Sequence, residues 1–538
     1  MTTPTHTRPA AAQPWALQAL VERYHLRAGG STAVQVTGVA SDNRVVTLGD
    51  LFVALPGSRV HGATFAADAI SRGAVAILTD EAGAALLGEG AGVPVLVAPD
   101  PRRVVGPIAA DIHGQPARSL TTFGVTGTNG KTTVTYLLDA INRALGQVTG
   151  LIGTVEMRSG GRTLPSKLTT PEAADLQSLL AAMRDDGVQS LAMEVSSHSL
   201  ALGRVDGLRF DVAGFTNLTQ DHLDFHGTME NYFAAKAELF TPERARHAVV
   251  MIDDDWGRRL ASTRSLPTTT VTTKPATPAH PATPPATWTV TEITAAGLGS
   301  AFTLSDKHGV ALRTSVNLPG EFNVANAALA CAMVLASGVS VEQLQVTLDQ
   351  AGGIKAEVPG RMEVISAADP QVIVDFAHNT EALQLALAAT RHTTVGDLVV
   401  VFGAAGERDQ GKRPLMGAAA AAGADLVILT DDDPYAEDPA RIRADVRGGI
   451  PTDARVQEIP DRRAAIAAAI AQAGPTDTVL IAGRGHETVQ PVAGHEIELD
   501  DRVEARAALS KRALGERDIN QRDLAKQDLT KRGATCAD

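Results

Sequence analysis

The sequence predicts an α/β protein of three domains. Its 538 residues are too many for one ordinary hydrophobic core, so several domains are expected. A glycine-rich segment at residues 124–134 separates an apolar, β-prone run from a segment with helical spacing, which predicts a strand, a phosphate-binding loop and a helix. Later in the chain, short apolar runs alternate with Ala-rich segments, a pattern typical of a doubly wound sheet.

Changes in this pattern divide the chain into four segments. We expect a small α/β domain at residues 1–119, a central domain with a phosphate-binding loop and a mostly parallel sheet at 120–356, a doubly wound α/β domain at 357–515 and a polar tail at 516–538. The tail is rich in charged residues, and nothing in it suggests catalysis.

The apolar runs predict the individual elements. In the first domain we expect a helix from Trp15 to Tyr24 and then strands at 34–36, 51–55, 74–78 and 93–97. The central sheet should include residues 190–195 and 248–252. The sheet of the third domain should include residues 371–376, 397–402, 425–429 and 478–481.

Residues 266–287 interrupt the central domain. Six prolines stand there among threonines and alanines. Proline cannot donate a hydrogen bond to a sheet, and this composition cannot bury a core. We therefore interpret the segment as an extended surface loop, a spacer without chemistry.

The bulk composition excludes several classes of function. A formal net charge of −13 disfavours nucleic acid or an anionic membrane as the main partner. Two cysteines, Cys331 and Cys536, cannot build a disulfide framework or a cysteine-based zinc site. The first residues lack the apolar stretch of a signal peptide, and no run is long enough to span a bilayer, so a cytoplasmic location is expected.

The glycine-rich segment predicts nucleotide chemistry. Backbone N–H groups in such a turn, at the start of a helix, attract phosphate. Lys131 can reach the terminal phosphates of ATP, and the Thr132 hydroxyl can hold Mg²⁺. Val125 stands where the usual pattern has a glycine. The residues expected to contact ATP here are Gly127, Thr128, Asn129, Gly130, Lys131, Thr132 and Thr133.

Three further segments carry polar groups after apolar runs. Glu194 ends a strand-like run, and a carboxylate there is a natural Mg²⁺ ligand beside a phosphate-binding loop. Residues 221–226 contain two histidines and two aspartates, which fit a Mg²⁺ site with one imidazole, or plain loop polarity, better than zinc. By periodicity alone, Lys236 lies on an amphipathic helix and faces solvent.

Taken together, these motifs resemble the Mur ligases of peptidoglycan synthesis, most closely the MurE branch. The resemblance covers roughly residues 35–510, without the 266–287 segment and the tail. It rests on 41–44 (SDNR), 49–54 (GDLFVA), 127–133 (GTNGKTT), 194–198 (EVSSH), 217–226 (NLTQDHLDFH), 232–240 (YFAAKAELF), 359–363 (PGRME), 374–378 (VDFAH), 411–416 (GKRPLM) and 485–487 (GHE). The first domain would then bind the uridine part of a nucleotide sugar.

The resemblance implies a two-step reaction at one site. A D-glutamate carboxylate of UDP-N-acetylmuramoyl-L-Ala-D-Glu would take the γ-phosphoryl group of ATP, and an amino acid would then displace phosphate. Lys236 would be a carbamate formed with CO₂, an oxygen ligand of the kind Mg²⁺ prefers. The implied catalytic residues are Lys131, Glu194, His222 and Lys236, and the implied Mg²⁺ ligands are Thr132, Glu194, His222 and carbamylated Lys236.

The same resemblance implies the other substrate contacts. Asn323 and Asp375 would contact the adenosine of ATP. The UDP-sugar dipeptide would contact Ser41, Asn43, Thr169, Thr170, Ser196 and Arg204. Several of these side chains also fit a local role, such as a helix cap or a turn before proline.

The third domain would choose the incoming amino acid. Arg408, Gly483 and Glu487 match positions that grip its common end. Diaminopimelate-type members typically carry Asp-Asn-Pro-Arg where this chain has Asp432, Asp433, Pro434 and Tyr435. Tyr435 removes a cation and Asp433 adds an anion, which predicts L-lysine or L-ornithine as the incoming amino acid. The alternative is meso-diaminopimelate, with its far carboxylate bound by another arginine.

Other functions remain open from the sequence. The chain could be a different Mur-type ligase, or a simple phosphate-loop ATPase or kinase that needs no amine. Its partners would be the small-molecule substrates, with no nucleic acid and no membrane, and we expect a monomer.

Overall fold

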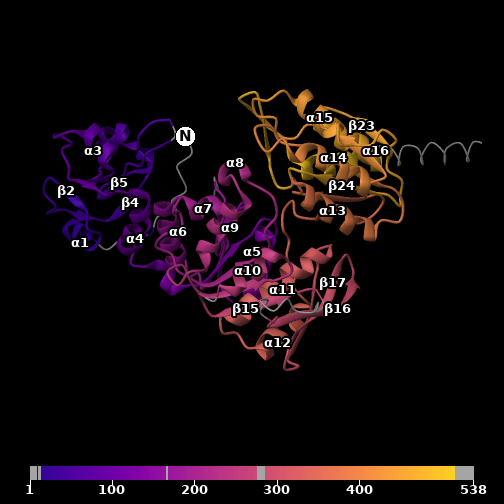
Figure 1. Ribbon diagram of the computed structural model, residues 1–538, viewed down its shortest axis with the longest axis horizontal. Coiled ribbons are helices and arrows are strands. Elements are labelled where there is room, and N and C mark those ends of the chain that lie inside the picture. Colours follow the sequence, from indigo (N-terminus) through magenta and orange to yellow (C-terminus); the bar gives the residue numbers. More distant parts are fainter. Residues whose placement is uncertain are drawn as a thin grey trace, which may run out of the picture.

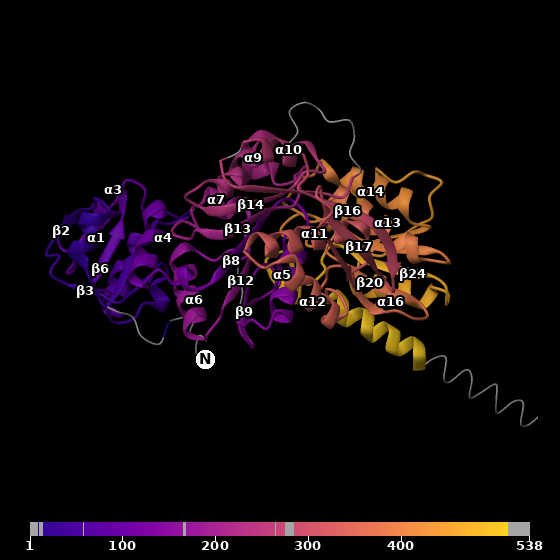
Figure 2. The same ribbon diagram turned by 90° about the horizontal axis from the view of Figure 1, so that it is seen from below.

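The computed structural model describes residue 9 and residues 14–57, 59–164, 168–263, 265–274 and 285–514. Three α/β parts follow one another along the longest axis, and the central part separates the N-terminal part from the C-terminal part in both views (Figures 1 and 2). The predicted tail at 516–538 and Cys536 lie outside the described residues.

The N-terminal part contains a five-stranded sheet in the order β2-β7-β6-β5-β4. Four strands are parallel, and β2 pairs antiparallel at the edge. The strands are β2 (Arg27–Gly29), β4 (Gly38–Ala40), β5 (Asp50–Val53), β6 (Ala76–Thr79) and β7 (Val95–Val97), and the helices are α1 (Leu17–Arg23), α2 (Ala66–Ser71), α3 (Glu81–Leu87) and α4 (Pro101–Ile112). Trp15–Ala16 forms the short strand β1 against β3 (Gln35–Val36), so the first helix begins two residues later than predicted.

The central part is built on an eleven-stranded sheet in the order β11-β10-β9-β12-β8-β13-β14-β15-β16-β17-β18. The strands from β9 to β16 pair in parallel, and antiparallel strands extend both edges. The strands are β8 (Thr121–Thr126), β9 (Thr149–Ile152), β10 (Met157–Ser159), β11 (Arg162–Leu164), β12 (Ser190–Glu194), β13 (Phe210–Phe215), β14 (Ala245–Met251), β15 (Thr268–Thr272), β16 (Trp288–Ala296), β17 (Gly299–Asp306) and β18 (Ala311–Val316).

Helices cover both faces of this sheet, and side chains alternate between them. Along β12, Ala192 packs with the core under α5, α11 and α12, whereas Leu191 and Met193 pack with the opposite core under α6, α7, α9 and α10. The helices are α5 (Lys131–Ala144), α6 (Ala173–Asp185), α7 (Ser197–Ala201), α8 (Leu223–His226), α9 (Met229–Ala237), α10 (Asp255–Ser262), α11 (Glu321–Ala336) and α12 (Val341–Ala351).

The prediction of a loop at residues 266–287 was wrong for its first part. Thr268–Thr272 form β15, inside the parallel sheet, and Val271 is fully buried. The β-branched run Thr-Thr-Thr-Val-Thr has no proline, so its own propensity favours a strand and outweighs the composition of the wider segment. Residues 275–284 lie outside the described residues.

The C-terminal part holds a six-stranded sheet in the order β19-β20-β24-β21-β22-β23. All pairs are parallel except β19 with β20. The strands are β19 (Glu363–Ser366), β20 (Gln371–Asp375), β21 (Leu398–Phe402), β22 (Leu426–Leu429), β23 (Val456–Glu458) and β24 (Thr478–Ala482), followed by a hairpin of β25 (Val489–Val492) and β26 (His495–Glu498).

Helices lie on both faces of this sheet, as predicted for a doubly wound domain. One core contains α13 (Thr380–Thr393), α14 (Lys412–Gly423) and α15 (Pro439–Arg447). The other contains α16 (Arg462–Gln472) and the helix that covers residues 501–514. The predicted strands 371–376, 397–402, 425–429 and 478–481 are found within one residue of their expected ends.

Candidate active site

The carboxyl ends of the central and C-terminal sheets open onto one cavity of about 610 Å³. Loops after β8, β12 and β13 contribute one wall, and loops after β20, β21, β22 and β24 contribute the other. Ligands of parallel α/β sheets bind at this end of the strands. The fold therefore brings the phosphate-binding loop and the predicted amino acid pocket together.

The loop between β8 and α5 is shaped by two glycines. Gly127 and Gly130 have φ angles of 148° and 89°, which residues with a Cβ rarely adopt. A Cβ on Gly127 would lie 1.9 Å from the Thr216 hydroxyl oxygen. Lys131 Nζ donates to the carbonyl oxygens of Gly127 and Thr128 at 3.1 and 2.9 Å, so its amine lies folded over the loop.

Glu194 and Thr132 form an oxygen pair beside this loop. The Thr132 hydroxyl donates to Glu194 Oε2 at 2.9 Å, and the backbone N–H of Thr154 donates to Oε1 at 2.8 Å. Glu194 is 1% exposed. Mg²⁺ takes a hydroxyl and a carboxylate together with substrate phosphates and water, so this pair fits the predicted metal. Within the described ranges, no three His, Cys, Asp or Glu side chains gather as a ready-made metal cluster.

Lys236 is buried, although its sequence period alone predicted a solvent-facing side chain. It is 1% exposed, and its Nζ donates to the Gly127 carbonyl oxygen at 2.7 Å and lies 4.5 Å from the centre of the Tyr232 ring. Burial and the nearby Lys131 ammonium lower the pKa of Lys236 well below its usual value. The amines of Lys131 and Lys236 therefore both donate to the Gly127 carbonyl, and the lowered pKa favours the neutral form of Lys236.

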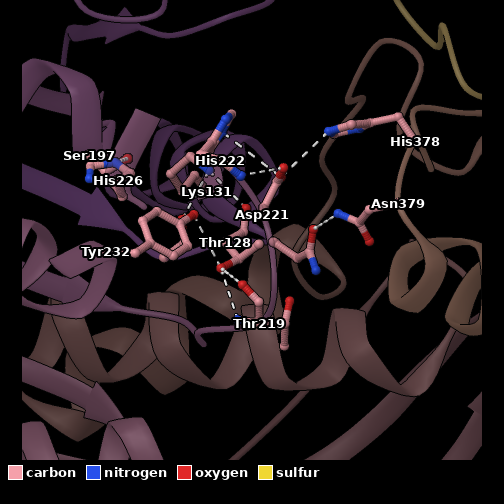
Figure 3. A network of polar contacts seen from close by, with 12 residues as sticks. Thr128, Lys131, Ser197, Thr219, Asp221, His222, His226, Tyr232, His378 and Asn379 are labelled. Carbon is pink, nitrogen blue, oxygen red and sulfur yellow. Dashed lines mark hydrogen bonds and ion pairs between the residues drawn. The ribbon is translucent and has the colours of Figure 1, made fainter. Parts of the chain in front are cut away.

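His222 lies above the loop, and Asp221 connects it to the C-terminal part (Figure 3). Burial lowers the pKa of His222 to about 4, so the imidazole is neutral and able to bind a metal. Asp221 lies 3.8 Å from His378. The rings of His222 and His198 are 5.0 Å apart in a T-shaped contact. Asp221, His198 and His378 all line the cavity and were not predicted as site residues.

Arg361 is another cavity residue that the prediction omitted, although the motif at 359–363 contains it. Its Nη2 lies 3.4 Å from the Thr132 hydroxyl, and its guanidinium stacks 4.1 Å from the centre of the Phe376 ring. Burial lowers the pKa of Arg361. The C-terminal part thus places a cation next to the predicted metal-binding pair.

The predicted contacts of the UDP-sugar dipeptide divide into two groups. Thr169, Ser196 and Arg204 line the cavity, and the Thr170 hydroxyl donates behind it to the Glu194 carbonyl at 3.0 Å. Ser41 and Asn43 lie in the N-terminal part, outside this cavity, where the Asn43 amide donates to Asp68 at 2.8 Å.

The two predicted adenosine contacts do not line the cavity. Asn323 is 2% exposed and donates to the Pro319 carbonyl at 2.7 Å. Asp375 accepts the Met362 N–H at 2.7 Å, and burial raises its pKa. Both side chains therefore hold backbone turns at the cavity edge.

The predicted amino acid pocket forms the C-terminal wall. Arg408, Asp432, Asp433, Tyr435, Gly483 and Glu487 line the cavity, whereas Pro434 does not. The Arg408 guanidinium lies 5.6 Å from the centre of the Tyr435 ring. Gly483 is needed here, because a Cβ on it would lie 2.4 Å from Asp432 Oδ2.

Acidic and basic groups share this wall: Asp409, Asp432, Asp433 and Glu487 line it together with Arg361, Arg408 and Lys412. Asp433 forms an ion pair with the fully buried Arg484. Burial and the neighbouring Asp432 carboxylate raise the pKa of Glu487 to about 7. The anion gained at Asp433 is thus matched by a cation that the sequence prediction did not consider.

Comparisons with known proteins agree with this geometry. Three stretches of the chain match family models. Residues 35–113 match the Mur ligase family, catalytic domain; residues 125–334 match the Mur ligase middle domain; and residues 360–485 match the Mur ligase, glutamate ligase domain. A UDP-N-acetylmuramoyl-L-alanyl-D-glutamate–2,6-diaminopimelate ligase of Streptomyces coelicolor is 45% identical over 95% of this chain and 99% of its own. A UDP-N-acetylmuramyl-tripeptide synthetase of Leifsonia xyli is 46% identical over 94% and 98%.

A solved structure supports the same relationship. The structure of a UDP-N-acetylmuramoyl-L-alanyl-D-glutamate–2,6-diaminopimelate ligase is 31% identical, with a TM-score of 0.64, and covers 93% of this chain and 100% of its own. Within the described residues, no helix is long and apolar enough to cross a membrane. The chain belongs to the Mur ligase family and is an ATP-dependent ligase of the MurE type.

Proposed function

We propose that this chain joins the D-glutamate carboxylate of UDP-N-acetylmuramoyl-L-Ala-D-Glu to an amino group of a diamino acid, using ATP. One observation carries the proposal: a single cavity has the phosphate-binding loop on one wall and the predicted amino acid pocket on the other. A simple ATPase, whose phosphoryl acceptor is water, would have no need of the second wall. The names of the relatives include this nucleotide-sugar dipeptide, which supports it as the substrate that takes the phosphoryl group.

The reaction needs an activated carboxylate, because an oxide is a poor leaving group. The D-glutamate carboxylate attacks the γ-phosphorus of ATP, ADP leaves, and an acyl phosphate forms. The amine then attacks the acyl carbon, and phosphate and a proton leave. Bound Mg²⁺ would neutralise the charge on the phosphates. Lys131 would bind the γ-phosphoryl oxygens, Thr132 and Glu194 would hold the metal, and His222 would offer a further ligand.

We further propose that Lys236 acts as a carbamate. Its lowered pKa and burial favour the neutral amine, which is the form that attacks CO₂. The nitrogen bonds to the carbon of CO₂ and loses a proton, so a neutral amine becomes an anion with two oxygens. That anion would be a second carboxylate-like ligand for Mg²⁺ beside the loop.

The choice of diamino acid depends on the far end of the pocket. Meso-diaminopimelate is favoured by the name of the Streptomyces relative and by Arg408, a cation that lies beside Tyr435. The ion pair of Arg484 with Asp433 also weakens the argument that the pocket has gained a net anion.

L-lysine or L-ornithine is the second candidate. Tyr435 carries no charge where an arginine would grip a distal carboxylate, and Asp432 and Glu487 are suited to an ammonium group. The Leifsonia relative has a name that specifies no amino acid, which is compatible with either acceptor.

One phosphate-release assay tests the reaction and compares the acceptors. The enzyme receives the UDP-sugar dipeptide, ATP and Mg²⁺, alone and then with L-lysine, L-ornithine or meso-diaminopimelate. We expect release only when a diamino acid is present. Equal release without any amine would contradict the proposal and favour a simple ATPase. We also propose that the chain acts as a cytoplasmic monomer, which light scattering and fractionation would test.

A further inference from the structure

We propose that Arg484 is a specificity-determining residue, which sets the acceptor preference by neutralising Asp433. This inference rests on the proposed function. Arg484 follows β24 and is 0% exposed, and it does not line the cavity. It acts through Asp433, which is 6% exposed, lines the cavity and accepts its ion pair.

The charges around the pocket show why this pair matters. Four carboxylates, Asp432, Asp433, Glu487 and Asp501, lie within ion-pair distance of two fully buried guanidinium groups, and Arg361, Arg408 and Lys412 add positive charge to the cavity lining. Arg462 pairs with Asp501 at 2.7 Å and lies 3.9 Å from Asp432. Arg484 pairs with Asp433 and lies 3.9 Å from Glu487. Of the three of these carboxylates that line the cavity, Asp433 therefore has the nearest buried guanidinium, whereas Asp432 and Glu487 each lie 3.9 Å from one.

The surroundings of Arg484 hold its guanidinium at Asp433. Its Nη2 donates to the carbonyl oxygens of Val489 at 2.9 Å and Leu499 at 3.3 Å. Its Nε–H is buried without a hydrogen-bond partner in the part of the chain that the structure describes. Burying an unpaired donor costs free energy, so satisfying every donor is not what keeps an arginine here. The ion pair with Asp433 gives a reason for an arginine at this position.

Changing either member of the pair should shift the acceptor preference in opposite directions. In Asp433→Asn the charge of Arg484 is no longer neutralised, which should favour an amino acid with a distal carboxylate. In Arg484→Gln the charge of Asp433 is no longer neutralised, which should favour an amino acid with a distal ammonium group. The ratio of kcat/KM for meso-diaminopimelate to kcat/KM for L-lysine should rise and fall, respectively, by about ten-fold or more.

Three further variants separate charge from structure. The double variant Asp433→Asn with Arg484→Gln should move the ratio back toward the wild-type value, although it also removes the Arg484 charge from Glu487, and Arg484→Lys should keep the ratio. Arg413→Gln is the matched control, because Arg413 is equally buried, pairs with Glu437 and Asp445, and does not line the cavity. It should lower the melting temperature without changing the ratio.

The outcomes distinguish this inference from the proposed function. If the wild type releases phosphate with a diamino acid but Asp433→Asn leaves the ratio unchanged, Arg484 has only a structural role and the inference is wrong. If the wild type turns over with no diamino acid, the proposed function fails and this inference with it. Because Asp433→Asn keeps the size of the side chain, the test does not depend on whether Arg484→Gln folds.

Discussion

Lys236 shows how surroundings decide the chemistry of a residue. On α9 its spacing fits an exposed amphipathic face, yet the side chain is buried against the Tyr232 ring and the phosphate-binding loop. An amine in that position loses hydration, and the pKa falls. Periodicity reports which side chains share a face of a helix, but not what covers that face.

Replacing this amine should remove turnover. We expect Lys236→Ala to lower kcat by at least about a hundred-fold, because a ligand-forming group beside the phosphates is lost. Added bicarbonate should not restore the activity of the variant. The control is Lys355→Ala, which removes an exposed lysine and should leave kcat unchanged. Full activity of Lys236→Ala in the phosphate-release assay would contradict the assignment.

Glu487 should give acceptor binding a pH dependence. Its pKa is raised from 4.5 to about 7, so the side chain is neutral below that pH and anionic above it. An acceptor ammonium should therefore bind better as the pH rises, and the acceptor KM should fall by up to about ten-fold between about pH 6 and about pH 8. Glu487→Gln should flatten this profile. A profile that stays unchanged in Glu487→Gln would assign the dependence to another group.

The same shift predicts an effect on stability with a definite sign. Between 4.5 and about 7 the unfolded chain releases the Glu487 proton while the folded chain keeps it. The free energy of unfolding should therefore fall as the pH rises through this window, and stay level for this group above it. Thermal melts of the wild type and Glu487→Gln should differ in slope there, and parallel curves would contradict the raised pKa.

At the scale of elements, the loop from β8 to α5 combines sequence and tertiary requirements. Gly127 adopts a φ of 148°, and its missing Cβ leaves room for the Thr216 hydroxyl, which donates to the Asn129 carbonyl at 2.6 Å. The loop therefore depends on the end of β13 for its shape. A phosphate-loop pattern in the sequence identifies the glycines but not this neighbour.

A pair of glycine substitutions should separate backbone strain from steric conflict. Gly146→Ala, at a φ of 82° with open space around it, should cost about 1–2 kcal/mol of stability and leave the ATP KM unchanged. Gly127→Ala adds the clash with Thr216, so it should cost more and also raise the ATP KM. Chemical denaturation and initial rates measure both. Equal effects of the two variants would mean that strain alone governs the loop.

Three strands that escaped prediction, β16 to β18, share a physical reason. The strands β16 to β18 have mixed burial and extend one edge of the sheet in an antiparallel hairpin pattern, so no long apolar run marks them. Buried parallel strands such as β21 are apolar at every position and were found directly. The formation of strands with one solvent-exposed face depends on partner strands that are distant in sequence.

At the scale of the whole molecule, the phosphate-binding loop is tied to the C-terminal part. The Asn129 amide donates to Glu381 at 3.0 Å and accepts from the Asn379 amide at 3.4 Å. Asp221 lies 3.8 Å from His378, a contact that Figure 3 shows beside Asn379. These contacts hold the two walls of the cavity together around the reacting groups.

Weakening this connection should reduce catalysis without abolishing it. We expect Glu381→Ala to lower kcat/KM for ATP by about five-fold, the effect of about 1 kcal/mol for one hydrogen bond. The fold of each part should be unaffected, because Glu381 lies in the first turn of α13. Glu342→Ala, in the first turn of α12 and away from the cavity, is the control. An unchanged kcat/KM would show that the Asn129–Glu381 contact does not help align the walls.

The sequence by itself determined the local parts of this protein: the phosphate-binding loop, the apolar parallel strands, and the motifs that place it among the Mur ligases. These are short-range patterns, written in neighbouring residues. Tertiary structure decided what those residues face. It buried Lys236, gave Asn323 and Asp375 hydrogen bonds to backbone groups, brought Arg361 to Thr132, and paired Asp433 with Arg484. Burial and charge depend on neighbours distant in sequence, and the order of residues does not state them.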